Sequence, residues 1–420
     1  MAAVLNHNDL YRLPWTLPDN AISWLEPTSA CNLACDGCYR KNESNSHKTL
    51  EEVRKELDTF RRLRKTDGVS IAGGDPLLHP EIERIVAMIA GDGLKPIINT
   101  NGLALTPEKL RVLKAAGVAG FTFHIDSRQQ RPHMKEGTET ELNQLRLRYA
   151  RMLAEVGGVS CAFNATVYEE TLQEVPEIVA WGQEHIDIVH ILVFIAYRAA
   201  PVRKGYDYFV GGRKIDMAPI AYAIREDRQT GILSTDIVEA IRERFPDFQP
   251  CAYLNGTERA DHFKWLLTMR IGTRERIYGH TGPRFMELAQ TLHHLRKGSY
   301  LAYTHPQVLA RAKSMLLLSP LDRGISAAAS AYLHDVASSP GLLFRPLHLQ
   351  SVMIIQPADF MPGGALSMCD GCPDITVWDN QLVWSCRMEE LKTFGDWVRA
   401  VPAEAGAGGP PPSGDISRIH

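Results

Sequence analysis

The segment Thr28–Arg40 reads TSACNLACDGCYR and places Cys31, Cys35 and Cys38 within one short loop. The chain has eight cysteines in 420 residues, and its 45% hydrophobic and 23% charged content is that of an ordinary globular protein. A chain of this length buries a large core and does not need disulfides to fold. The three clustered cysteines therefore need another explanation.

The chain carries no sign of export or of membrane insertion. Its first residues, MAAVLNHNDLYRLPW, lack the basic and apolar regions of a signal peptide, and no apolar run reaches the roughly 18 residues of a membrane helix. We therefore expect the protein in the cytosol, where disulfides are rare. Clustered cysteines in that compartment are more often metal ligands or catalytic groups than disulfide partners.

Helical and strand-like patterns alternate around the cysteine loop, from residue 23 to residue 200. TPEKLRVLKAAG (Thr106–Gly117), for example, has the Thr cap, the Pro at the first helical position and the final Gly of a complete helix. Such alternation predicts an α/β fold with a parallel sheet and helices outside it. The predicted strands are the segment before Cys31 and residues 68–73, 95–102, 118–127, 159–167 and 187–197, and the predicted helices are residues 48–65, 80–93, 106–117, 141–158 and 172–185.

Beyond residue 200 the alternation stops. Residues 201–350 read mostly as helices and loops, with apolar and aromatic side chains among Lys, Arg and His, so we expect a helical region that caps the sheet. Residues 351–400 form a small cysteine-rich segment with a strand at 351–357 and a hairpin at 375–384 that turns at Asp379 and Asn380. Residues 1–22 lead into the sheet, and the Ala-, Gly- and Pro-rich residues 401–420 are predicted to be a disordered tail.

The spacing of the three loop cysteines fits an iron–sulfur cluster with one open iron. Fe–S clusters are normally held by four cysteines, so three thiolates leave the fourth iron of a [4Fe–4S] cube free for chemistry. A structural zinc ion also requires four ligands, and no His lies within five residues of the three cysteines. A redox C-x-x-C pair would not need Cys31.

The sequence CNLACDGCY resembles the C-x3-C-x2-C signature of radical S-adenosylmethionine (radical SAM) enzymes. Gly37 stands where that family usually has an aromatic residue, and Tyr39 follows the third cysteine instead. The resemblance implies a partial (βα)6 barrel with the loop after its first strand. It also implies a cluster whose open iron chelates S-adenosylmethionine, a 5′-deoxyadenosyl radical made from that cofactor, and an electron donor such as ferredoxin or flavodoxin.

The same resemblance places an S-adenosylmethionine pocket at the carboxyl ends of the predicted strands, where such folds bind ligands. The sequence IAGGDP (Ile71–Pro76) is similar to the GGE motif of the family, with Asp75 in place of Glu as the expected acceptor for the ammonium group. The third, fourth and fifth strands end in NTNG, FHIDS and AFNATV. The sixth strand ends near Ala196, where the resemblance implies contacts with the adenine ring. The pocket residues assigned in this way are Gly73, Gly74, Asp75, Asn101, Asp126, Ser127 and Asn164. Cys161 lies inside a strand and is expected to be a small buried hydrophobe.

A second set of cysteines lies near the C-terminus. Cys369 and Cys372 form a C-x2-C pair, a hairpin follows, and Cys386 comes after it. A fourth thiol is needed to close a metal site, and Cys251 is the best remaining candidate. This extension resembles the twitch or SPASM-type domains of radical SAM proteins, which implies an auxiliary [4Fe–4S] cluster; a structural zinc is the alternative.

The substrate is less well specified. Stretches such as HFKWLLTMRIG and SPGLLFRPLHLQ combine long apolar and basic side chains, and basic apolar helices can lie on anionic membranes. We therefore expect a large apolar or lipid-like substrate and peripheral membrane contact, in loose resemblance to tetraether lipid synthases, with C–C bond formation or another modification as the outcome.

Two other functions stay open. One is the modification of a peptide, protein or small metabolite by dehydrogenation, crosslinking or methylation, although no peptide-recognition module precedes Cys31. The other is a cluster-bearing assembly or binding protein. Nucleic-acid binding is not indicated, because the pI is about 6.6 and no basic helix or RNA module is present. His293 and His294 are adjacent and point about 100° apart on a helix, so they are not expected to share a site.

Overall fold

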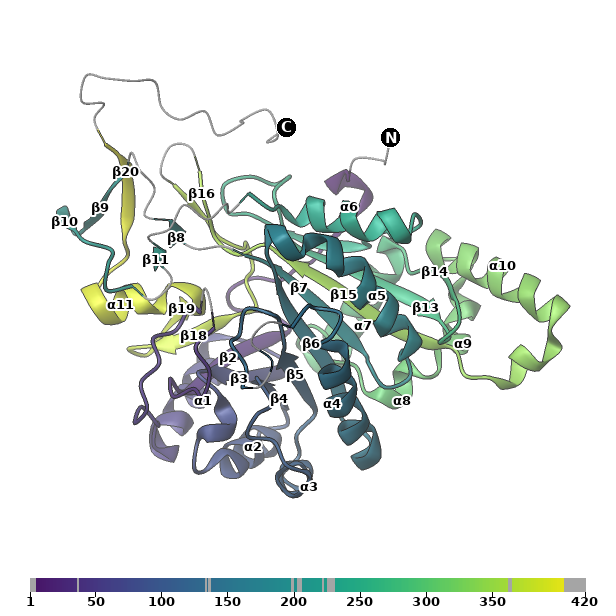
Figure 1. The fold of residues 1–420 in the computed structure, drawn as a ribbon, viewed down its shortest axis with the longest axis horizontal. Helices are drawn as coiled ribbons and strands as arrows, with labels where there is room; N and C mark the ends of the chain where they lie inside the picture. The colour runs from purple at the N-terminus through teal and green to yellow at the C-terminus, as the bar shows by residue number, and fades with distance from the viewer. Residues whose placement is uncertain are drawn as a thin grey trace.

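One large sheet runs through the molecule, with helices against it (Figure 1). The computed structural model describes residues 5–35, 38–132, 134, 137–197, 200–201, 206–220, 223–224, 231–361 and 365–403. The sheet has eleven strands, ten of them in the order β1-β12-β13-β15-β7-β6-β5-β4-β3-β2, while β14 pairs with β13. These strands are β1 (Tyr11–Arg12), β2 (Ile22–Thr28), β3 (Gly68–Gly73), β4 (Lys95–Thr100), β5 (Gly120–His124), β6 (Ser160–Val167), β7 (Ile191–Ala196), β12 (Ala252–Asn255), β13 (Phe263–Gly272), β14 (Ile277–His280) and β15 (His348–Ile355).

The six strands predicted from the alternation are confirmed as β2 to β7, and each pairs in parallel with the next. The five predicted helices are also present and end within a few residues of the expected positions: α1 (Leu50–Leu63), α2 (Ile82–Gly91), α3 (Pro107–Ala115), α4 (Asn143–Val156) and α5 (Val175–Glu184). Thr106 caps α3 as expected, since its side chain accepts from the N–H of Lys109. Their apolar faces and those of the strands form the main core, which contains Phe60, Ile85 and Phe123.

In the described part of region 201–350, helices lie beside strands of the main sheet, and the prediction of a helical region did not include these strands. HFKWLLTMRIG contributes β13, a strand between β12 and β15 in the main sheet, rather than a membrane-binding helix. The local sequence misled because β13 buries the charged residues Lys264 and Arg270, whereas charged residues usually mark an exposed face. The helices that do lie here and just beyond are α6 (Ser234–Arg244), α7 (Pro283–Lys297), α8 (Pro306–Leu309), α9 (Ala312–Met315), α10 (Arg323–Ser338) and α11 (Met388–Phe394), and the 3-10 helices of the chain are η1 (His7–Asp9), η2 (Pro76–Leu78), η3 (Glu169–Glu174), η4 (Leu316–Leu318), η5 (Pro340–Phe344) and η6 (Ser385–Arg387).

The predicted strand at 351–357 exists as β15, but it belongs to the main sheet. It pairs in parallel with β7 and antiparallel with β13, so the boundary expected at residue 351 falls inside a sheet strand. The predicted hairpin is present as an antiparallel pair, with Asp379 and Asn380 at φ of 49° and 60° in its turn. The remaining short strands are β8 (Ala200–Pro201), β9 (Tyr206–Val210), β10 (Arg213–Ile215), β11 (Ala223–Ile224), β16 (Asp359–Phe360), β17 (Leu366–Ser367), β18 (Ile375–Trp378), β19 (Gln381–Trp384) and β20 (Arg399–Pro402).

The start of the predicted tail is also corrected. Residues 401 and 402 belong to β20, which pairs with β9. The rest of the segment, from residue 404 onward, lies outside the described residues. Figure 1 shows β9, β10 and β20 at one end of the molecule and α10 at the other.

A loop after α7 closes the amino ends of the parallel strands. The Tyr303 hydroxyl lies 2.6 Å from the Thr122 hydroxyl inside the sheet, and Lys95 donates to the Tyr303 carbonyl at 2.9 Å. The two adjacent histidines of α7 do not share a site, as predicted. His293 Nε2 lies 3.2 Å from an Asp67 carboxylate oxygen and His294 Nε2 lies 2.7 Å from an Asp19 oxygen.

None of the helices in the described ranges has the length and apolar character needed to span a bilayer.

The buried histidine at the start of β7 makes stability depend on pH. Burial lowers the pKa of His190 to about 4, and its Nδ1 accepts from the Cys161 N–H at 2.9 Å. An unfolded His takes up a proton near pH 6.5, so below that pH the unfolded chain gains protons that the folded chain does not. We expect His190 to reduce the free energy of unfolding by about 2 to 3 kcal/mol between pH 7 and pH 4.5.

Urea unfolding of wild type and His190→Asn at both pH values measures this effect. Asn keeps an acceptor for the Cys161 N–H but does not titrate, so the variant should lose less stability on acidification. Equal losses in the two proteins would contradict the prediction.

Candidate active site

The three loop cysteines follow β2 at the carboxyl end of the parallel sheet. Asn42 holds this loop on both sides of Cys31: its Oδ1 accepts from the Cys31 N–H at 3.0 Å and its Nδ2 donates to the Cys31 carbonyl at 2.8 Å. Cys38 N–H bonds to the Cys35 carbonyl at 3.3 Å. Asp36 and Gly37 lie outside the described residues. The Sγ of Cys31 lies 3.8 Å from Nδ2 of Asn101, the residue that directly follows β4.

The surroundings of the three thiols disfavour their free thiolate forms. Burial raises the pKa of all three, and the charges of Asp126 and the two other cysteines raise that of Cys35 further. Thiolates are the form that binds metal, and a positively charged group between them would relieve this repulsion. In the part of the chain that the structure describes, no three His, Cys, Asp or Glu side chains already converge on a metal position.

Gly73 and Gly74, at the carboxyl end of β3, lie directly against the start of the cysteine loop. The Gly74 N–H donates to the Thr28 carbonyl at 2.8 Å, and Gly73 has a φ of 102°. A Cβ on Gly73 would lie 2.3 Å from the Thr28 oxygen, and a Cβ on Gly74 would lie 2.2 Å from the Ala30 oxygen. Only glycine fits at these two positions, because the cysteine loop itself occupies the space of a side chain.

Asp75 makes contacts within the protein. Its carboxylate accepts from the Thr100 hydroxyl at 2.9 and 2.8 Å, from the Asn101 N–H at 2.9 Å and from the Leu77 N–H at 3.0 Å. The residue is only 1% exposed. These contacts make Asp75 a positioning residue for Asn101, whereas direct contact with a cofactor ammonium stays a prediction.

Asp126 and Ser127 lie after β5, next to a histidine that was not predicted. His124 Nε2 lies 2.9 Å from Asp126 Oδ2 and 3.1 Å from the Thr166 hydroxyl. Burial alone would raise the pKa of Asp126, but the hydrogen bond and charge of His124 hold it below its ordinary value. Alternation along a strand puts residues two apart on one face, so the spacing of His124 and Asp126 was a usable signal. The Ser127 N–H donates to Glu139 at 2.6 Å.

Asn164 pairs in register with His124 across the β5–β6 ladder. Its Oδ1 is buried, and no donor among the described residues reaches it. A buried acceptor without a partner is costly, so this oxygen is suited to a donor group of a bound cofactor. The predicted pocket residues thus come together along the carboxyl edge of β3 to β6.

The C-terminal cysteines form a separate group of three. The Cys369 and Cys372 thiols are hydrogen-bonded to each other, and this contact, followed by burial, raises the pKa of Cys372. Burial, followed by the charge of Cys369, raises the pKa of Cys386 to about 12. The backbone of this segment is fixed to the rest of the protein, because Arg64 donates to the Cys372 carbonyl at 2.8 Å and Asn20 donates to the Gly371 carbonyl at 3.0 Å.

The other two cysteines are Cys251 and Cys161. Cys251 shares an apolar cluster with Cys369 and Cys372, but its thiol donates to the Leu267 carbonyl at 3.3 Å and accepts from the Thr281 hydroxyl at 3.7 Å. The thiol of Cys251 is thus hydrogen-bonded to Leu267 and Thr281, and its role as a ligand stays a prediction. Cys161 is fully buried in the main core, as expected for a small hydrophobe.

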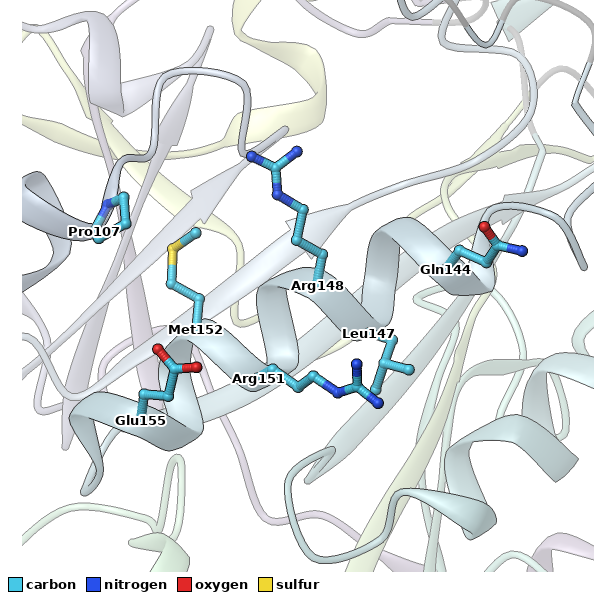
Figure 2. Close-up of a pocket in the computed structure, with 7 residues that line it drawn as sticks. All are labelled: Pro107, Gln144, Leu147, Arg148, Arg151, Met152 and Glu155. Atoms are coloured by element: carbon cyan, nitrogen blue, oxygen red, sulfur yellow. The ribbon is translucent and has the colours of Figure 1, made fainter.

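A hollow on the outer surface does not coincide with this site. It has a volume of about 480 Å³ and lies between the start of α3 and the exposed face of α4, with Arg148, Arg151 and Glu155 on its wall (Figure 2). None of the predicted cysteine or pocket residues lines it.

Part of the chain is similar to known proteins. Residues 25–182 match the family model of the radical SAM superfamily. An AdoMet-dependent heme synthase of Nitratidesulfovibrio vulgaris is 29% identical over 128 residues, which cover 29% of this chain and 34% of that protein. The tungsten-containing aldehyde ferredoxin oxidoreductase cofactor-modifying protein of Pyrococcus furiosus is 25% identical over 237 residues, covering 54% and 65%. The PqqA peptide cyclase of Xanthomonas campestris pv. campestris is 27% identical over 188 residues, covering 42% and 48%.

The chain spans less than two thirds of the length of each of these relatives. The matched region begins in β2, includes the three loop cysteines and ends in α5. It therefore contains the cysteine loop and most of the strand ends described above. Residues 25–182, which hold this loop and these strand ends, are similar to the radical SAM superfamily.

Proposed function

We propose that this protein is a radical SAM enzyme whose [4Fe–4S] cluster is held by Cys31, Cys35 and Cys38. The observation that carries the proposal is the position of the three thiols, at the carboxyl end of β2 and 3.8 Å from Asn101 in the case of Cys31. Held by these three thiols, the cluster would supply one-electron reduction of S-adenosylmethionine, with the electron coming from an external reductant, and thereby hydrogen abstraction from the substrate.

The protein's own residues bind and orient the cofactor in this proposal. Asn164 offers an unpaired acceptor, and Asp126 offers a carboxylate whose lowered pKa keeps it ionised at neutral pH. His124 and Thr166 fix that carboxylate. Asp75 acts indirectly in this proposal, because its carboxylate holds the backbone N–H of Asn101 beside the cysteine loop. An external reductant such as ferredoxin or flavodoxin is required.

The C-terminal group supports a second metal centre. Cys369, Cys372 and Cys386 influence one another electrostatically, the first two are buried and Cys386 is half-buried, and we propose that they hold an auxiliary [4Fe–4S] cluster. Cys251 stays a candidate for the fourth ligand, although its present contacts favour a structural role. A zinc ion on the same thiols is the alternative.

We propose a large organic substrate. Relatives named as a peptide cyclase, a heme synthase and a cofactor-modifying protein support a peptide or another metabolite. The lipid-like alternative has lost part of its support, because residues 263–272 are a sheet strand, although Leu317 and Phe344 remain 81% and 91% exposed. Stronger binding to anionic than to neutral liposomes is the observation that would favour it.

The test measures iron, sulfide and zinc after anaerobic reconstitution, and 5′-deoxyadenosine after addition of dithionite and S-adenosylmethionine. We expect about eight irons per chain and formation of 5′-deoxyadenosine, with about four irons lost when Cys369, Cys372 and Cys386 are replaced by Ala. About four irons with bound zinc would keep the radical chemistry and make the C-terminal site structural. A protein with neither iron nor 5′-deoxyadenosine would contradict the proposal.

A further inference from the structure

The buried guanidinium of Arg40 connects the segments that carry the two cysteine groups. Arg40 comes two residues after Cys38 and is 3% exposed. Its Nε donates to Glu26 Oε2 at 2.5 Å and its Nη2 donates to Glu26 Oε1 at 2.6 Å, in the bidentate geometry that Arg forms with carboxylates. The same Nη2 donates to the carbonyl of Ser385 at 2.7 Å. Ser385 is the residue directly before Cys386.

Further contacts close this network. The Ser385 hydroxyl donates to Glu26 Oε1 at 2.7 Å, so Glu26 binds both segments at once. Arg40 Nη1 lies 3.5 Å from Glu389 Oε1, in the helix that follows Cys386. Neither Arg40 Nη1 nor Glu389 Oε1 has a closer hydrogen-bond partner among the described residues. Through Arg40, the loop after Cys38 is therefore bound to Ser385, which precedes Cys386, and to Glu389, which follows it.

The network of Arg40, Glu26 and Ser385 connects the edge of the main sheet to the C-terminal hairpin. Glu26 lies on β2, the last strand in the order of the main sheet, and β18 of the C-terminal hairpin packs against β2. A second buried guanidinium, that of Arg64, holds the Cys372 carbonyl on the other side of the hairpin. The hairpin at 375–384 is thus attached at both ends, by Arg64 before it and by Arg40 after it.

We propose that Arg40 is a positioning residue that couples the two cysteine groups, by fixing Cys386 relative to the loop that carries Cys38. Lys cannot replace it in this role. A Lys ammonium can pair with Glu26, but it lacks the planar fork that binds both carboxylate oxygens and the Ser385 carbonyl. The inference rests on the proposed function only where it concerns metal-loaded protein.

Alkylation of the metal-free protein tests the coupling directly. Wild type, Arg40→Lys and Arg40→Gln are treated anaerobically with iodoacetamide, and the rate at each cysteine is read by mass spectrometry. We expect Cys386 to react about tenfold faster or more in Arg40→Lys, because a charge-assisted hydrogen bond to its neighbour is lost. Cys161 should stay unreactive, which shows that the core is intact.

Two control variants sharpen the result. Arg84→Gln breaks an exposed ion pair with Glu81 and should leave every rate unchanged. Arg64→Lys should expose Cys372 more than Cys386. An unchanged Cys386 rate in Arg40→Lys with Cys161 still protected would overturn the proposal, and so would equal acceleration at Cys372 and Cys386. If Arg40→Gln unfolds, Arg40→Lys still decides between these outcomes.

The metal-loaded protein provides a second readout. If both clusters assemble, Arg40→Lys should shift the reduction potential of the C-terminal cluster while the iron content stays the same. An unchanged potential together with an unchanged Cys386 rate would again overturn the coupling. Absence of iron from the wild type would contradict the proposed function alone, since the alkylation result does not depend on metal.

Discussion

Replacing Cys35 with Ala is expected to remove about four irons per chain and to abolish 5′-deoxyadenosine formation. Cys35 is the central thiol of the loop, and its pKa is raised by burial and by the charges of Asp126 and the other two cysteines. A cluster held by three thiolates cannot lose one and keep its site-specific open iron. Substitutions outside the ligand shell of metal sites cost about 10- to 100-fold, so loss of a ligand itself should cost at least about a thousandfold.

The matched control is Cys161→Ala, which removes a buried thiol from β6 without touching the cysteine loop. It should lose some stability through the cavity it creates, but keep its iron and its cofactor cleavage. Iron, sulfide and 5′-deoxyadenosine are measured for both variants under the same anaerobic conditions. Full activity in Cys35→Ala, or equal loss in both variants, would show that the loop thiols are not the ligands.

Replacing Arg146 with Met is expected to destabilise the fold by about 3 to 5 kcal/mol. Arg146 is fully buried in α4, and its guanidinium pairs with Glu139 Oε2 at 2.6 Å. It also donates to the Ile125 carbonyl at 2.7 Å, while Glu139 Oε1 accepts from the Ser127 N–H. Removing the guanidinium leaves the buried Glu139 carboxylate without its counter-ion, and an uncompensated buried charge strongly destabilises the fold.

Urea unfolding followed by circular dichroism measures this change, and Arg148→Met is the control. Arg148 lies two residues further along the same helix and is exposed, so its replacement should alter stability by less than about 0.5 kcal/mol. Arg146→Met should also weaken cofactor binding in whatever protein remains folded, because Ile125 and Ser127 flank Asp126. A loss below about 1 kcal/mol in Arg146→Met would contradict the account of this pair.

The parallel part of the sheet was predictable because its signals are local. Each strand of the series is a short apolar run, and each of the first five is followed by a helix. Two of these helices, α1 and α3, begin at a Thr N-cap, and such patterns can be read within about fifteen residues. The cysteine loop was recognisable for the same reason, since the spacing of its three cysteines lies within one short segment. The hairpin at 375–384 also follows from adjacent residues, because Asp379 and Asn380 tolerate the positive φ of its turn.

Sequence reasoning failed where contacts join distant segments. The pairing of β15 with β7 joins residues 351–355 to residues 191–195, and β13 enters the sheet only through β12 and β15. Lys264 and Arg270 made that strand hard to recognise, because charged residues suggest an exposed segment. Each is buried with a partner that lies far away in the sequence: Lys264 pairs with Asp359 at 2.7 Å, and Arg270 pairs with Gln350. Local patterning contains no information about such partners.

The candidate site divides in the same way. The three loop cysteines, the second cysteine group and the polar strand ends can be read from the sequence, because these depend on residue type and on spacing within single segments. The folded chain adds that Asp75 holds Asn101, that His124 binds Asp126, and that Cys251 has partners other than cysteine. It also brought Arg40 to Ser385, across 345 positions of the chain. Burial and hydrogen-bond partnership are properties of the folded chain, since they depend on which distant groups exclude water from a side chain.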